Sequence, residues 1–201
     1  MNTHYTLQVN NDSLQSGDFC IFQTMPEINI ANIVSLAWLS KAASPTTKLL
    51  FQWQTDLDFV WTNATTAQSG ATVSACQSWP ATTIKNNKVE LDKVNGAYGF
   101  TNQTTSDSPG NLIIEQRPNV LANEISVGIG MGGKATFAVP SQPNMQIMMS
   151  PKPNYWLCFG SFKQGESVDV ASISKYACKL DFKTTTNMAV SFGVNNCWII
   201  G

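Results

Sequence analysis

Charged residues are scarce in this 201-residue chain, and their scarcity restricts the partners that it can attract. Asp, Glu, Lys and Arg make up 12% of the sequence, against roughly 25% in an average soluble domain. The 12 basic and 13 acidic residues leave a net charge of -1, so we expect no nucleic-acid partner. A weakly charged surface also lacks self-repulsion, which favours a homo-oligomer or another form of self-assembly.

Long apolar runs and export signals are missing as well. No stretch of the sequence reaches the about 18 consecutive apolar residues that a membrane-spanning helix needs. The N-terminus has no basic segment followed by an apolar one, so no conventional signal peptide is indicated. These absences predict a protein without a membrane span and with a cytoplasmic location, and they leave non-classical export open.

Cysteine and histidine are too few, or too scattered, for the common metal and catalytic sites. The five cysteines are odd in number and include no C-x-x-C motif, which favours free thiols in a reducing compartment without excluding a disulfide. His4 is the only histidine and lies near a chain end, so we expect no histidine-based catalysis. We also expect no metal site and no cofactor.

Short strand-like runs, separated by turn residues, follow one another along the sequence. Asn95-Gly96, Gly132-Gly133 and Asn195-Asn196 each separate two such runs, and all are residues that tolerate a positive φ. The pattern predicts an all-β protein, an antiparallel two-sheet β-sandwich built from many short hairpin-connected strands. Because no linker or composition shift divides the sequence, we expect a single domain over residues 1–201.

The segment Lys48 to Trp61 has the strongest strand pattern. Apolar residues alternate with polar ones up to Gln54, and a second aromatic run follows Thr55-Asp56. We interpret the segment as a β-hairpin. Residues 30–43 are compatible with one or two helical turns before Pro45, but we favour a strand there.

The sequence from Gly128 to Gly133 formally matches the dinucleotide-binding motif G-x-G-x-x-G. That motif requires a helix directly after the glycines, so that the pyrophosphate meets the helix N-terminus. Here the strand-like sequence KATFAVP follows instead. We therefore interpret the glycines as part of a strand that enters a tight hairpin.

Four residues are the candidates for a ligand site. Asp56 and Asp58 would form an acid/base pair or a calcium or sugar contact if they share a face, although a turn also recruits Asp for backbone hydrogen bonds. Trp79 and Trp156 lie near prolines and expected loops, where an indole ring can stack on a sugar. Core packing is the alternative for both tryptophans.

Five segments of the sequence, in order, resemble the RhiA family of rhizosphere-expressed bacterial proteins. They are CIFQ, VSLAWLSKAASPTT, FQWQTDLDFVW, VGIGMGGKATFAVPSQPN and YWLCFGSFKQGE. The resemblance implies a soluble, cytoplasmic bacterial protein with a cell-density-regulated role in interaction with a host or the surroundings. It implies no catalytic residue and no cofactor.

Three hypotheses for function remain open at this point. The first is a non-enzymatic protein that self-associates or binds a small molecule, which the low charge and the abundant amide side chains favour. The second is a lectin-like, carbohydrate-binding protein that uses Trp79, Trp156 and nearby polar residues. The third is an enzyme with an unrecognised carboxylate site at Asp56 and Asp58.

Overall fold

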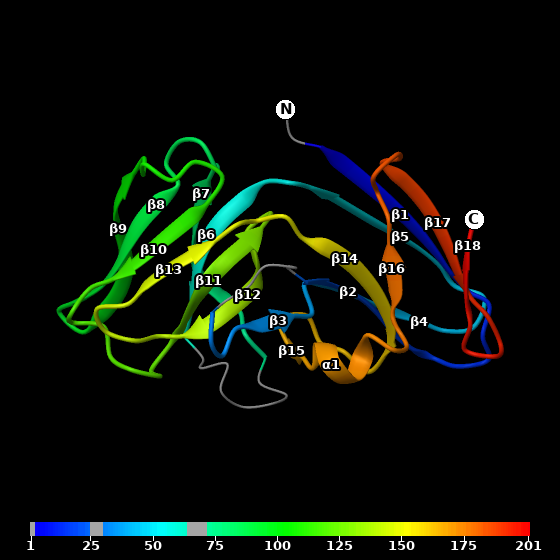
Figure 1. Cartoon of the computed structure of the whole chain (residues 1–201). Coiled ribbons are helices and arrows are strands. Elements are labelled where there is room, and N and C mark those ends of the chain that lie inside the picture. The colour runs from blue at the N-terminus through cyan, green and yellow to red at the C-terminus, as the bar shows by residue number, and fades with distance from the viewer. Residues whose placement is uncertain (1–2, 25–29, 64–71) are drawn as a thin grey trace.

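The computed structural model describes residues 3–24, 30–63 and 72–201, and almost all of its regular structure is β-strand. The strands form four sheets whose pairings are mostly antiparallel, as the sequence predicts. The number of sheets differs from the predicted two. Two pairings, β1 with β17 and β10 with β8, are parallel. Figure 1 shows the sheets in two groups, one at each end of the molecule.

Two four-stranded sheets make up the first group. Each strand order runs from edge to edge, β18-β17-β1-β5 in one sheet and β16-β14-β2-β4 in the other. The first sheet consists of β18 (Trp198–Ile200), β17 (Asn187–Phe192), β1 (His4–Asn11) and β5 (Lys48–Gln54). The second consists of β16 (Cys178–Leu180), β14 (Asn154–Gly160), β2 (Gly17–Thr24) and β4 (Leu39–Ala43).

A four-stranded and a six-stranded sheet make up the second group. Their strand orders are β13-β10-β8-β9 and β15-β3-β12-β11-β6-β7. The first consists of β13 (Gln146–Met149), β10 (Leu112–Gln116), β8 (Lys88–Val94) and β9 (Ala97–Thr104). The second consists of β15 (Ser167–Val168), β3 (Val34–Leu36), β12 (Lys134–Pro140), β11 (Ser126–Met131), β6 (Leu57–Thr62) and β7 (Ala75–Ala81).

Each group has its own apolar core, to which both of its sheets contribute side chains. The core of the first group is rich in large rings, among them Phe19, Phe51, Trp53 and Tyr155, and we call this group the aromatic pair. The core of the second group consists mainly of Val, Leu and Ile side chains, and we call it the aliphatic pair. The alternation of buried and exposed residues along β5 puts Phe51 and Trp53 into the aromatic core.

The predicted hairpin from Lys48 to Trp61 is wrong. β5 pairs with β1, whereas β6 pairs with β11 and β7, so the two strands lie in different sheets. Figure 1 shows them as successive parts of one long path that crosses the molecule. Neither Thr55 nor Asp56 has the positive φ that a two-residue hairpin turn requires. The chain therefore passes from one sheet pair to the other at this point.

Other local predictions agree with the structure. Asn95 and Gly96 have φ values of 52° and 83° and join β8 to β9, and Gly132-Gly133 joins β11 to β12. The Asn195-Asn196 segment joins β17 to β18, although its connection is longer than two residues. Residues 30–43 contain strands β3 and β4, and no predicted helix corresponds to α1 (Val170–Ile173).

The glycine motif in β11 is part of a strand and a hairpin, as interpreted from the sequence. Every residue of β11 is buried, and β6 and β12 lie on either side of the strand. A Cβ atom at Gly128 would lie 2.0 Å from the Phe137 carbonyl oxygen, so a larger residue does not fit there. The glycines thus serve close strand packing.

The chain passes between the two pairs more than once, for example from β3 to β4 and from β13 to β14. Trp38 lies at the first of these passages and is 2% exposed, and its indole N–H donates a 3.0 Å hydrogen bond to the Met131 carbonyl oxygen at the end of β11. This contact joins the aromatic core to a strand of the aliphatic pair. The single-domain organisation remains a prediction.

Candidate functional site

The two predicted aspartates, Asp56 and Asp58, stabilise a turn, Asp56 through its backbone and Asp58 through its carboxylate. One oxygen of the buried Asp58 carboxylate accepts a 2.7 Å hydrogen bond from the Gly133 N–H, and the Asp56 carbonyl oxygen accepts one from the Gly132 N–H at 2.9 Å. The turn that they stabilise is the β11–β12 hairpin and not their own segment. Both residues border a surface cavity of about 770 Å³, together with threonines such as Thr82.

The two predicted tryptophans lie in strands of different sheets and are not brought together. Trp79 is part of β7 and packs against Phe100, with ring centroids 5.9 Å apart. Trp156 is part of β14 and stacks on Phe22, and its indole N–H donates a 3.0 Å hydrogen bond to the Thr24 hydroxyl. Both side chains are partly buried against core clusters, which agrees with the core-packing alternative.

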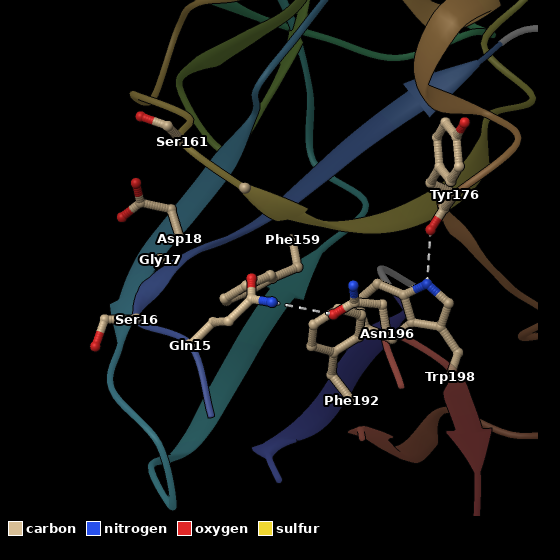
Figure 2. Close-up of a pocket in the computed structure, with 11 residues that line it drawn as sticks. Gln15, Ser16, Gly17, Asp18, Phe159, Ser161, Tyr176, Phe192, Asn196 and Trp198 are labelled. Carbon is tan, nitrogen blue, oxygen red and sulfur yellow. Dashed lines mark hydrogen bonds between the residues drawn. The ribbon is translucent and has the colours of Figure 1, made fainter. Parts of the chain in front are cut away.

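A different pocket, at the end of the aromatic pair, has the features of a ligand site. Its volume is about 470 Å³. Figure 2 shows that four segments, distant in sequence, meet around it. Its lining residues are Gln15, Ser16, Gly17, Asp18, Phe159, Gly160, Ser161, Tyr176, Phe192, Asn196 and Trp198.

Aromatic rings packed against one another form the apolar side of the pocket. The ring centroid of Phe192 lies 4.7 Å from that of Phe159 and 4.6 Å from that of Trp198. The Trp198 indole N–H donates a 2.7 Å hydrogen bond to the Tyr176 carbonyl oxygen, which fixes the orientation of the indole ring. The Tyr176 side chain is 77% exposed at the edge of the pocket. The site therefore offers aromatic surface that a ligand can contact.

The segment after α1 positions Tyr176. The Asp169 carboxylate caps α1 by accepting hydrogen bonds from the hydroxyl and the N–H of Ser172, and these bonds lower the pKa of Asp169. The Tyr176 N–H then donates to the Ile173 carbonyl oxygen at 2.9 Å. This local bonding holds the Tyr176 backbone where it can accept the bond from Trp198.

Hydroxyl and amide side chains form the polar side. The Gln15 amide donates a hydrogen bond to the Asn196 side-chain oxygen at 3.5 Å, which joins the β1–β2 and β17–β18 connections. One oxygen of the Asp18 carboxylate accepts a 3.3 Å hydrogen bond from the Phe162 N–H. Figure 2 shows Ser16, Asp18 and Ser161 on the side of the pocket away from Trp198. These groups can donate and accept hydrogen bonds to a ligand.

Gly17 permits the close packing at the base of the pocket. A Cβ atom at this position would lie 2.9 Å from both the Gly160 carbonyl oxygen and the Cζ atom of Phe159. A larger residue would push apart the strands β2 and β14 that supply two sides of the pocket. The shape of the site therefore depends on a glycine at position 17.

The pocket is almost uncharged. Of the described residues that line it, Asp18 alone carries a formal charge. Within residues 3–24, 30–63 and 72–201 there is no group of three or more His, Cys, Asp or Glu side chains that could hold a metal ion. In the same residues no helix combines the length and apolar character needed to cross a bilayer.

Sequence reasoning missed this pocket because its lining residues come from distant parts of the chain. Trp198 was not among the predicted site residues, and it also packs against Phe19 and Phe192. A local signal was available, because Trp198 closely follows the Asn195-Asn196 turn at a strand end. Residues 15–18 and 159–161 carry no comparable signal.

Comparisons with known proteins give one family. The family model described as RhiA matches residues 2–201 of the chain. Protein RhiA of Rhizobium leguminosarum bv. viciae is 30% identical over 161 residues, which cover 79% of this chain and 69% of that protein. No solved structure shows a significant match.

Proposed function

This chain belongs to the RhiA family, and we propose that it is a non-enzymatic member that binds a neutral, hydroxyl-rich ring, such as a sugar, in the pocket at the end of the aromatic pair. The observation that carries the proposal is the juxtaposition of the Phe192 and Trp198 rings with uncharged amide and hydroxyl groups. Under this proposal, the ligand predicted from the sequence would bind in this pocket.

The chemistry of a sugar suits both sides of the pocket. The C–H face of a pyranose ring is apolar and packs on an aromatic ring, whereas its hydroxyls need donors and acceptors nearby. Phe192 and Trp198 supply the rings, and Gln15, Ser161 and Asn196 supply hydroxyl and amide groups. A cavity of about 470 Å³ lies within the range of roughly 300–1,000 Å³ that is usual for small-molecule sites.

The carboxylates favour binding over cleavage. Hydrolysis of a glycosidic bond uses two carboxyl groups that flank the bond, roughly 5–10 Å apart. Among the described lining residues Asp18 is the single carboxylate, and one of its oxygens already accepts the Phe162 N–H. The alternative of an enzyme with a site at Asp56 and Asp58 is less favoured, because the Asp58 carboxylate already accepts a hydrogen bond from the Gly133 N–H.

Self-association is the second candidate function. It is supported by the net charge of -1 and by the apolar side chains that remain exposed in the segments that supply the pocket residues, namely Leu14, Tyr176, Val194, Ile199 and Ile200. We further propose that each pair of sheets forms a β-sandwich, because one core cluster takes side chains from both sheets of the pair. A cytoplasmic location and a cell-density-regulated role in host interaction are also proposals.

Titration of the protein with a panel of neutral monosaccharides, followed by NMR chemical shifts, tests the ligand proposal. We expect at least one sugar to shift resonances of residues 15–18 and 192–198. Trp198→Ala should weaken its binding about five- to tenfold, because a lost ring contact costs roughly 1–1.5 kcal/mol.

Trp156→Ala is the matched control, since Trp156 is also a partly buried tryptophan of the aromatic pair. It should leave the affinity unchanged. Equal binding by Trp198→Ala and the wild type would contradict the pocket assignment. Loss of binding in Trp156→Ala alone would instead support the site first predicted from the sequence.

A further inference from the structure

We propose that the outer edge of β18 is a docking surface for β18 of a second copy of this chain. The inference rests on self-association, the second candidate function, and is independent of the ligand. β18 is an edge strand of the aromatic pair, and Ile199 and Ile200 on it are 62% and 57% exposed. An exposed apolar edge strand offers its backbone groups to another strand.

The backbone of β18 has hydrogen-bonding groups directed away from its own sheet. The Gly193 N–H donates to the Cys197 carbonyl oxygen at 3.0 Å, and the Gly201 N–H donates to the Ala189 carbonyl oxygen at 2.9 Å. Residues 197 and 201 therefore face β17. Because backbone groups alternate sides along an antiparallel strand, the N–H and C=O groups of Trp198 and Ile200 point to the outer edge.

β18 also lacks the features that protect another edge strand of this protein. β13 is an edge strand flanked by Pro143, Pro151 and Lys152, and prolines and lysines block pairing with a further strand. The segment from Gly193 to Gly201 contains neither a proline nor a charged residue. The β18 edge is therefore suited to accept a strand, whereas the β13 edge is not.

A second copy is a suitable occupant because the edge is self-complementary. With a twofold axis at Ile199, Trp198 of one copy lies opposite Ile200 of the other, and each of these two pairs can exchange two backbone hydrogen bonds. The side chains that meet are apolar or uncharged in both copies, so no like charges are brought together. Opposed residues share a sheet face, so Ile200 of the second copy would lie beside Trp198, which lines the pocket.

Sedimentation velocity on the full chain, over a series of concentrations, tests this arrangement. We expect the wild type to form a dimer in a concentration-dependent manner. Ile199→Lys should raise the dimer dissociation constant about tenfold or more, because it puts two cations directly opposite each other at the twofold axis. Ile200→Pro removes the outward N–H while leaving the residues that face β17 in place, and it should have the same effect.

Met148→Lys, which adds the same charge to an exposed apolar position on the β13 edge, is the matched control and should dimerise like the wild type. A mixture of Ile199→Lys and Ile199→Glu chains should recover the dimer, because the opposed charges then attract. A wild type that stays monomeric throughout overturns both the surface and self-association. A dimer unaffected by Ile199→Lys and Ile200→Pro, or a mixture that stays monomeric, overturns the surface alone.

Discussion

The aromatic and aliphatic pairs of sheets share one chain and one kind of secondary structure, but they fill their interiors differently. Tyr5, Trp53, Tyr155 and Phe182 contact one another inside the aromatic pair, with ring centroids 4.8–6.1 Å apart. In the aliphatic pair branched side chains dominate, and contacts between rings are fewer in the described residues. The surface cavities of the two pairs also differ in whether aromatic residues line them.

The cavity beside the aliphatic pair is larger than the pocket of the aromatic pair, at about 770 Å³ against about 470 Å³. None of its described lining residues is aromatic, and its polar groups include the Asp58 carboxylate that bonds to the Gly132-Gly133 turn. The smaller pocket has ring surface next to amide groups. Chemical character, more than volume, therefore distinguishes the candidate site.

The largest expected effect comes from a change at the passage between the two pairs. Trp38→Ala should lower the free energy of unfolding by about 3–5 kcal/mol, because it leaves a cavity in the aromatic core and removes the hydrogen bond to Met131. We expect urea denaturation followed by NMR to show the aromatic pair unfolding at a lower urea concentration than the aliphatic pair.

Trp38→Phe is the control for that experiment, since it keeps a ring in place and removes the N–H donor. It should lower the free energy of unfolding clearly less than Trp38→Ala does. A single unfolding transition shared by both pairs in Trp38→Ala would mean that other contacts hold the two cores together.

A smaller effect, confined to the aliphatic pair, is expected at Asp58. Asp58→Ala should lower the free energy of unfolding by about 1.5–3 kcal/mol, because the Gly133 N–H loses a charged acceptor. Hydrogen exchange should become faster for backbone amides in β11 and β12 and stay unchanged in β17. Asp58→Asn, which retains an acceptor oxygen, should have a weaker effect, and equal acceleration in both pairs would contradict the local role.

The smallest expected effect is specific to the aromatic pair and appears in alkaline solution. Burial raises the pKa of Tyr155 to about 12 from an ordinary value of 10.0. Since the folded state keeps the proton that the unfolded state loses, this contribution to stability is complete below pH 10 and falls as the pH rises toward 12. At pH 11 the contribution of Tyr155 to the free energy of unfolding should be about 1.4 kcal/mol smaller than at neutral pH.

Chemical denaturation of the wild type and Tyr155→Phe at neutral pH and at pH 11 isolates this contribution, because the other titrating groups are common to both proteins. The stability difference between the two should shift toward the variant by about 1.4 kcal/mol at the higher pH. A constant difference would show that Tyr155 loses its proton equally readily in the folded and unfolded states.

Structure that depends on neighbouring residues could be predicted from the sequence, and structure that depends on distant contacts could not. Asn95-Gly96 and Gly132-Gly133 define hairpins by themselves, since their backbones adopt the positive φ that such turns need. Thr55-Asp56 has no such property, yet the alternation around it suggested a hairpin. The alternation of apolar and polar residues predicts which side chains of β5 and β6 are buried. It does not identify the strands that pair with β5 and β6.

The candidate site illustrates the same limit. Trp198 was visible in the sequence as one aromatic residue among many, and its role in the pocket depends on Phe159, Gly17 and Tyr176, which only the fold brings near. The carboxylates of Asp56 and Asp58 stood out because a single residue separates them in the sequence. The Asp56 carbonyl oxygen and the Asp58 carboxylate accept hydrogen bonds from Gly132 and Gly133, in a hairpin some 75 residues away.

The parallel pairing of β1 with β17 has a consequence for the order of folding. Thr6 to Asn11 align with Asn187 to Phe192, so this part of the sheet has a very high contact order. During synthesis β5 is made early, but nearly all of the chain must be made before β17, the other neighbour of β1, exists. Because β17 and β18 also supply Phe192 and Trp198, we expect the pocket to be among the last parts of the molecule to acquire its final form, after the β8–β9 and β11–β12 hairpins.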